Sequence, residues 1–181
     1  MVQYKRGHLY YPEISIHKVL EDTAKRFPNR PAFLYPENMN FKQFKEQVDI
    51  FATGLKNLGV RKGDRVALYS PNSIQWEISF YGLEKAGAIL VPMNPLFKET
   101  EVEYEANDSG AETIIVSQPE YPHVAAVKDK TNIKNIIIIE SEENPEIPEG
   151  AIAWLDLISN TSPDVRLVPE ARYFLSLSRI D

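Results

Sequence analysis

The sequence predicts an α/β fold: a doubly wound, mostly parallel sheet with helices on both faces, in a single domain over residues 1–181. Two observations predict it. Short runs of consecutive apolar residues, typical of strands buried on both faces, alternate with segments of helical periodicity. The length of 181 residues also fits one domain, because domains cluster at roughly 100–200 residues. Right-handed crossovers between such strands place helices on both faces of the sheet.

The first elements are expected before residue 60. Apolar positions at Val19, Leu20, Ala24 and Phe27 suggest a first helix, and residues 32–35 a first strand. The clearest helix spans residues 41–58, where apolar residues recur at spacings of three and four and so form one buried stripe. The stripe consists of Phe41, Phe44, Val48, Phe51, Leu55 and Leu58. The charged residues Lys42, Lys45, Glu46, Asp49 and Lys56 fall outside it.

The middle of the chain alternates strands and helices. Residues 65–69 are a buried strand, and Asn72 with Gln75 resembles a capping box that opens a helix over residues 74–86. This helix is apolar on most sides, which is typical of a helix buried between layers. Gly87 ends it, and the next strand, residues 88–91, is expected to stop at Pro92.

The same unit repeats downstream. Thr100 and Glu103 suggest a second capping box and a helix that runs to Ser109. A strand over residues 113–116, a helix over 121–130 and a strand over 136–139 follow, and residues 154–158 form one more short apolar piece.

Other stretches have the character of connections. Residues 140–150 carry five Glu and two Pro and are expected to be a solvated acidic connector. Residues 159–170 are loop-like, residues 173–177 resemble the start of a strand, and residues 171–181 form a divergent end.

Composition excludes several classes of protein. With 43% apolar and 25% charged residues, the chain has the composition of an ordinary globular protein. Acidic residues outnumber basic ones, 26 to 20, and no compact Lys/Arg cluster is present, so a nucleic-acid partner is not expected. The chain has no cysteine, which excludes disulfides, thiolate metal sites and a cysteine nucleophile.

No apolar run approaches the roughly 20 residues that span a bilayer, and the N-terminus has no uninterrupted apolar core of a signal peptide. The sequence therefore predicts a cytoplasmic protein without a membrane span. The glycosylation-type matches at Asn107 and Asn160 are interpreted as chance.

The search for catalytic or binding motifs assigns no residue. Gly54 and Gly59 have the glycine spacing of a phosphate-binding loop, but the Lys-Ser/Thr that should follow is missing and Gly54 lies inside the strongest helical stripe. His8, His17 and His123 have no metal-ligand spacing and are expected to be surface or partly packed residues.

Two further clusters are best explained without a catalytic or binding role. Glu99, Glu101, Glu103 and Glu105 alternate along a helix and are expected to form a solvated face rather than an acid/base pair. An aromatic group at helical spacing favours core packing over a binding platform; it consists of Trp76, Phe80 and Tyr81. From the residues alone we expect no catalytic, substrate-binding or metal-binding residue.

A series of short motifs in fixed order gives more information. They are residues 25–32 (KRFPNRPA), 40–44 (NFKQF), 54–60 (GLKNLGV), 62–67 (KGDRVA), 71–73 (PNS), 83–88 (LEKAGA) and 91–95 (VPMNP). In this order they resemble the N-terminal part of the acyl-CoA synthetases, and most of all the fatty-acid–CoA ligases, within the adenylate-forming enzymes. The resemblance covers residues 13–118 well and 119–170 loosely. Residues 40–44 depart from the usual Thr-Tyr-x-Glu-Leu but keep its aromatic and apolar places.

The resemblance implies two half-reactions for a full-length relative. A fatty acid attacks the α-phosphate of ATP, with Mg²⁺, to give acyl-AMP, and coenzyme A then displaces AMP. The family's phosphate loop, a glycine-rich Ser/Thr segment that ends in Pro-Lys-Gly, has no counterpart here, because no glycine follows Gly150. A contact between Asn94 and coenzyme A is implied as a minor alternative to a structural role for the loop that holds it.

Three hypotheses follow. The first is an N-terminal portion of a fatty-acid–CoA ligase, truncated before the phosphate loop, inactive alone and without a cofactor of its own. The second is a non-catalytic interaction or regulatory module that pairs with a complementing chain or self-associates through exposed apolar surface. The third, an unrelated Rossmann-like nucleotide binder, lacks a phosphate loop.

Overall fold

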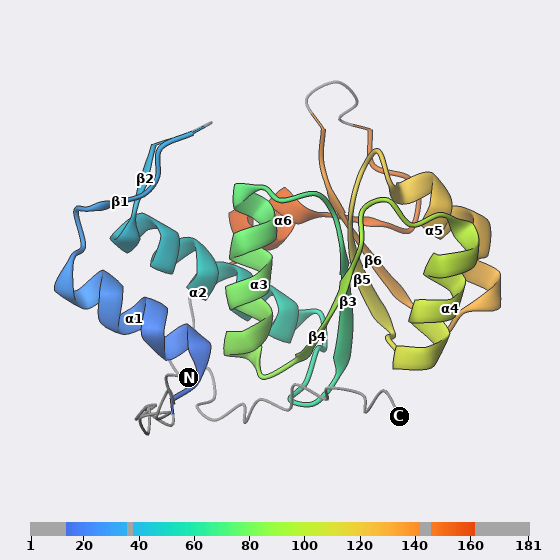
Figure 1. The fold of residues 1–181 in the computed structure, drawn as a ribbon, viewed down its shortest axis with the longest axis horizontal. Coiled ribbons are helices and arrows are strands. Elements are labelled where there is room, and N and C mark those ends of the chain that lie inside the picture. The colour runs from blue at the N-terminus through green and yellow to red at the C-terminus, as the bar shows by residue number, and fades with distance from the viewer. Residues whose placement is uncertain (1–13, 36–37, 142–145, 162–181) are drawn as a thin grey trace, which may run out of the picture.

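The computed structural model describes residues 14–35, 38–141 and 146–161, and its centre is a parallel sheet (Figure 1). Within these residues the sheet has five strands in the order β4-β3-β5-β6-β7, and all neighbours are parallel. The strands are β3 (Arg65–Tyr69), β4 (Ile89–Met93), β5 (Thr113–Ser117), β6 (Asn135–Ile139) and β7 (Ile152–Ala153). The α/β class with a mostly parallel sheet is confirmed.

Helices cover both faces of this sheet. Figure 1 shows α2 (Phe41–Asn57), α3 (Ile74–Ala86) and α6 (Trp154–Ser159) on one face, and α4 (Glu99–Ser109) and α5 (Tyr121–Val127) on the other. Side chains alternate along each strand, so that Val66 and Leu68 join the core beneath α2 and α3, whereas Ala67 and Tyr69 join the core beneath α4 and α5. The expected helix over 121–130 is α5 followed by a 3₁₀ turn, η1 (Lys128–Lys130).

The N-terminal elements lie outside the main sheet. Helix α1 (Ile16–Arg26) packs on α2 and α3, and β1 (Pro31–Phe33) pairs antiparallel with β2 (Met39–Asn40) in a separate two-stranded sheet. The expectation of a strand over residues 32–35 is therefore wrong at its end: Leu34 and Tyr35 are 74% and 86% exposed. The connection to β2 is too short for a crossover helix, so the chain turns back as a hairpin.

Two helix starts differ from the expected capping boxes. At α3 the cap is Ser73, whose Oγ accepts a hydrogen bond from the Trp76 amide at 3.0 Å, and not Asn72. At α4 the Glu101 carboxylate accepts from the Lys98 amide at 3.1 Å, so the helix begins before Thr100. At α3 the neighbouring Ser73 offers the same kind of side-chain acceptor as Asn72, whereas at α4 the N-cap residue Lys98 makes no side-chain cap hydrogen bond.

Strand β4 runs through Pro92 instead of stopping there. Pro92 pairs in register with Leu68, and the strand continues to Met93. Because β4 is an edge strand, one of its sides makes no ladder hydrogen bonds, and a proline without an N–H is tolerated there. The expectations for residues 162–181, including the strand at 173–177 and the divergent end 171–181, lie outside the described residues.

A candidate site at the carboxyl edge of the sheet

The topology marks one place on the sheet where a ligand would bind. From β3 the chain winds through α3 to β4 on one side, and from β5 it winds through α5 to β6 on the other. The neighbouring strands β3 and β5 therefore form the point at which the winding direction reverses. In open α/β sheets ligands bind at such a point, outside the carboxyl ends of the strands. Here these ends are Tyr69 and Ser117.

Tyr69 closes the floor of this edge. Its side chain is fully buried, and its hydroxyl donates a hydrogen bond of 2.6 Å to the Phe97 carbonyl. Burial, together with the negative charges of Glu120, Glu99 and Glu101, raises the pKa of Tyr69 to about 12. The phenol therefore stays protonated at neutral pH, and its role is to hold the loop that follows β4.

Gln118 fastens the acidic connector to the end of β5. Its side-chain amide donates to the Glu146 carbonyl at 2.7 Å and accepts from the Ser141 amide at 2.9 Å. The neighbouring Ser117 hydroxyl donates to the Glu120 carboxylate. One buried residue thus ties the described flanks of the connector to the sheet edge. The expectation of a purely solvated stretch did not include this contact.

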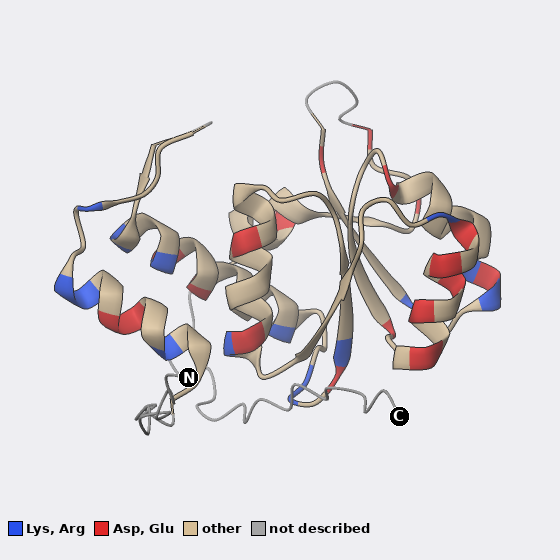
Figure 2. Ribbon diagram, viewed as in Figure 1, with Lys and Arg blue, Asp and Glu red and all other residues tan. Residues whose placement is uncertain are grey.

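Three polar side chains meet where α4 and α5 begin. His123 Nδ1 lies 2.8 Å from Glu99 Oε1, and His123 Nε2 lies 3.1 Å from Lys98 Nζ. The hydrogen bond from His123 lowers the pKa of the exposed Glu99 carboxyl. The expectation of a partly packed His123 is confirmed, whereas Glu99 is not simply solvated, because it binds the imidazole. Figure 2 shows other acidic residues along α4, of which Glu103 lies 3.6 Å from Lys130.

The two glycines with the spacing of a phosphate loop have structural roles, Gly54 in packing and Gly59 in the backbone turn after α2. Gly54 lies inside α2, and a Cβ at this position would be 2.8 Å from the Leu157 carbonyl oxygen of α6. The close approach of α6 to α2 requires glycine here. Gly59 follows the helix with φ of 99°, a left-handed conformation that favours glycine.

Other residues singled out in the sequence also take structural places. Asn94 is exposed, and its Oδ1 accepts a hydrogen bond of 2.9 Å from the Leu96 amide, which shapes the loop after β4. Trp76 stacks on Phe80 with ring centroids 5.6 Å apart, and both pack partly buried against the core, as does Tyr81. His8 lies outside the described residues.

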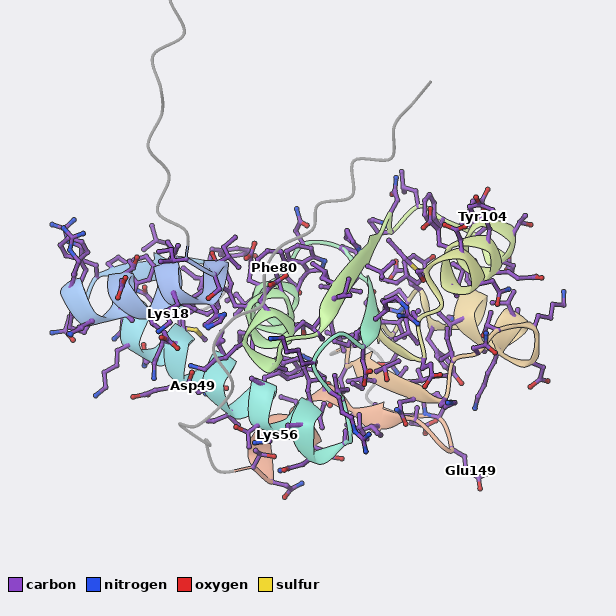
Figure 3. All side chains as sticks on the ribbon, turned by 90° about the horizontal axis from the view of Figure 1, so that it is seen from below. Lys18, Asp49, Lys56, Phe80, Tyr104 and Glu149 are labelled. Carbon is purple, nitrogen blue, oxygen red and sulfur yellow. The ribbon has the colours of Figure 1, made fainter. Side chains whose placement is uncertain are left out.

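A buried charged cluster was not expected from the sequence. Lys85 Nζ on α3 lies 2.6 Å from Asp49 on α2 and 2.6 Å from Glu21 on α1, and Lys45 also pairs with Asp49. Asp49, which Figure 3 shows on α2, was placed outside the apolar stripe; it is buried because α1 and α3 cover that side of the helix. The neighbouring His17 is 3% exposed, so the expectation of a surface or partly packed residue is wrong here, and burial lowers its pKa. The cluster joins α1, α2 and α3, on the side of the sheet opposite to α4 and α5.

In the part of the chain that the structure describes, no three His, Asp or Glu side chains come together as a metal site. The same residues contain no helix with the length and apolarity needed to cross a membrane.

Residues 20–172 match the AMP-binding enzyme family. This chain belongs to that family. It is 34% identical over 140 residues to the long-chain-fatty-acid–CoA ligase of Salmonella typhimurium, a match that covers 76% of this chain and 25% of that protein. It is also 39% identical over 119 residues to a mitochondrial medium-chain acyl-CoA ligase of Rattus norvegicus, with 63% and 19% covered. The chain thus spans about a quarter or less of the length of these relatives.

Solved structures agree with the sequence relatives. A long-chain-fatty-acid–CoA ligase from Archaeoglobus fulgidus superposes with a TM-score of 0.81 at 30% identity, over 94% of this chain and 35% of that one. An anthranilate–CoA ligase in complex with anthranoyl-AMP superposes with a TM-score of 0.77 at 30% identity, over 84% and 29%. The resemblance to acyl-CoA synthetases stated from the motifs is confirmed.

Proposed function

We propose that these residues form the N-terminal α/β portion, a single domain over residues 1–181, of an ATP-dependent fatty-acid–CoA ligase. The superposition on the Archaeoglobus fulgidus ligase, over 94% of this chain, is the observation that carries the proposal. The identity of 34% to the Salmonella typhimurium ligase supports a fatty acid as the carboxylate substrate. A whole ligase of this kind joins the fatty acid to coenzyme A through an acyl-adenylate.

The described residues supply scaffold for that reaction. In this proposal ATP, Mg²⁺ and coenzyme A belong to the whole ligase. The contact between Asn94 and coenzyme A remains a prediction, and its test is coenzyme A affinity of a whole ligase that carries Asn94→Ala. The proposal includes a cytoplasmic location, and cell fractionation tests it.

We further propose that the 181 residues alone do not form acyl-adenylate. The sequence contains no glycine-rich Ser/Thr loop to hold the ATP phosphates, and catalysis of phosphate chemistry depends on such fixed donors and cations. The test is pyrophosphate exchange into ATP with palmitate present, with a whole ligase as the positive control. We expect no exchange above the buffer rate. Exchange that depends on palmitate would overturn this part of the proposal.

A second function, an interaction module that pairs with a complementing chain or with itself, is favoured by one observation. Leu34 and Tyr35 beside the hairpin, and Leu96 after β4, are apolar side chains with more than 70% of their surface exposed. Size-exclusion chromatography with light scattering tests it. A dimer, or binding of an apolar dye that a complementing segment displaces, supports pairing, whereas a monomer that binds no dye argues against it.

A further inference from the structure

Lys98, His123 and Glu99 form a hydrogen-bonded series whose proton positions follow from chemistry. A carboxylate only accepts hydrogen bonds, so the contact of 2.8 Å to Glu99 places the ring proton of His123 on Nδ1. The other ring nitrogen, Nε2, then keeps its lone pair and faces the Lys98 amine at 3.1 Å. The imidazole is therefore oriented as a base toward the lysine nitrogen.

This order of groups is that of an activated nucleophile. A nucleophile gains reactivity when a base lies within hydrogen-bond reach and a third group orients the base. Here the nucleophile is an amine instead of a hydroxyl. Lys98 is exposed, and the His123 side chain keeps 21% of its surface exposed, so a small reagent reaches the amine while the ring stays partly packed.

We propose that Lys98 is a selective site of acylation by acyl thioesters, with His123 as the base that takes the proton which the neutral amine loses as the amide forms. The proposal goes beyond the ligase function, because it needs neither ATP nor an acyl-adenylate. It assigns to this chain a modification site built entirely from described residues of α5 and the start of α4.

The step balances with the thioester as the only co-reactant. Lys98 first loses one proton to solvent, which leaves a neutral amine. Its lone pair attacks the thioester carbonyl carbon, so that a C–N bond forms and the C–S bond breaks. The second proton passes from Nζ to His123 Nε2 and then to the departing thiolate. The products are an amide on Lys98 and a free thiol, and nothing is oxidised or reduced.

Another lysine provides an internal comparison. Lys134 is exposed, and its Nζ lies 2.8 Å from the Glu112 carboxylate, so it has a carboxylate partner where Lys98 has the imidazole. A carboxylate is a weaker base than imidazole and is a poor acceptor for the amine proton in such a step. Both lysines are exposed and both have a polar partner, and the oriented imidazole is the difference between them.

The test measures acetylation of each lysine in the 181-residue chain over time by peptide mass spectrometry. The reagent is a neutral thioester, S-acetyl-N-acetylcysteamine, which the nearby carboxylates of Glu99 and Glu101 do not repel. We expect Lys98 to react at least about tenfold faster than Lys134. This threshold is modest, because general-base catalysis typically contributes about 100-fold or more. Lys98→Arg removes the modified peptide and confirms its assignment.

The variant His123→Gln separates base catalysis from exposure. It keeps hydrogen-bonding groups but no basic nitrogen, so the rate at Lys98 should fall to that of Lys134, while Lys134 itself is unchanged. Equal rates at the two lysines in the unaltered chain, or a rate at Lys98 unaffected by His123→Gln, overturns the proposal. The comparison within the unaltered chain stands even if the variant folds poorly. Neither readout depends on pyrophosphate exchange, so failure here is distinct from failure of the ligase assignment.

Discussion

Lys85 Nζ lies 2.6 Å from Asp49 Oδ1, and both side chains are more than nine-tenths buried. With Glu21 at the same distance from Lys85, the pair fastens α1 and α2 to α3. Burial by itself opposes the charged form of Lys85, but the hydrogen bonds and charges of Asp49 and Glu21 outweigh burial and raise its pKa. Lys85 therefore stays charged. This pairing explains the lysine in the LEKAGA motif, because Lys85 is the cation shared by two acidic residues from other helices.

Replacing Lys85 with Met should destabilise the chain strongly, because it leaves Asp49 buried without its main cation. Breaking a buried ion pair costs about 3–5 kcal/mol, and we expect the low end since Lys45 still pairs with Asp49. Urea unfolding of the chain measures the change. The matched control is Lys42→Met, which removes an exposed partner 4.0 Å from Glu46 and should change stability by less than about 1 kcal/mol. Equal effects of the two variants would contradict a structural role for the buried cluster.

His17 should make the chain less stable in mild acid. Burial, with the positive charges of Lys85 and Lys18, outweighs Glu21 and Asp49 and lowers the pKa of His17 below its usual 6.5. At this residue the unfolded chain then binds a proton more readily than the folded one, so the contribution of His17 to stability is largely constant above about pH 6.5 and falls as the pH drops below it. The fall is measured by the free energies of unfolding at about pH 7.5 and about pH 5.5, one unit above and one unit below the usual histidine pKa.

The variant His17→Gln isolates this contribution from that of the carboxylates, which titrate in both proteins. We expect a smaller loss of stability between the two pH values in His17→Gln than in the unaltered chain. An equal loss in both would show that the buried imidazole has no part in the acid response.

Ser79 and Trp154 form a buried hydrogen bond between α3 and α6. The indole Nε1 donates to Ser79 Oγ at 2.8 Å, and the ring stacks on Phe51 with centroids 5.3 Å apart. Ser79→Ala leaves the indole N–H without an acceptor and should cost about 1–3 kcal/mol. In a Trp154→Phe background the same substitution should cost much less, because no donor remains. A full cost in that background would mean that the serine hydroxyl acts through another partner.

Gly54→Ala should destabilise the contact between α2 and α6, although alanine favours helix more than glycine by about 1 kcal/mol. The new Cβ would lie 2.8 Å from the Leu157 carbonyl, and moving α6 away costs typically about 1–3 kcal/mol. In a Trp76→Phe background the remaining tryptophan is Trp154, at the start of α6, and its fluorescence should report the displacement. A stabilised chain with unchanged fluorescence would mean that α6 adjusts freely and that the glycine is not needed for packing.

Sequence periodicity predicted the elements that bury one apolar face against the sheet. The stripe from Phe41 to Leu58 and the apolar runs of β3, β5 and β6 were predicted within one or two residues, because burial fixes their pattern. The separate hairpin at β1 and the passage of β4 through Pro92 were missed, because both depend on which strand lies next to which.

Prediction of the charged and polar clusters depended on tertiary contacts more than prediction of the strands did. Asp49 and Lys85 lie far apart in the sequence and separately resemble surface charges, and only the packing of α1 and α3 on α2 joins them. In the same way, the series Lys98, His123 and Glu99 requires α4 and α5 to lie side by side (Figure 1). Figure 3 shows Tyr104 on α4 as well, where it is 65% exposed and takes no part in that series.

The ligase assignment is tested most directly by a chimera in which residues 14–161 replace the matching segment of the Salmonella typhimurium long-chain-fatty-acid–CoA ligase. The measurement is palmitate-dependent pyrophosphate exchange into ATP. If these residues supply the same scaffold, the chimera should show exchange clearly above that of a whole-ligase variant without a phosphate loop. A chimera that is folded by circular dichroism yet shows no palmitate-dependent exchange would contradict the assignment.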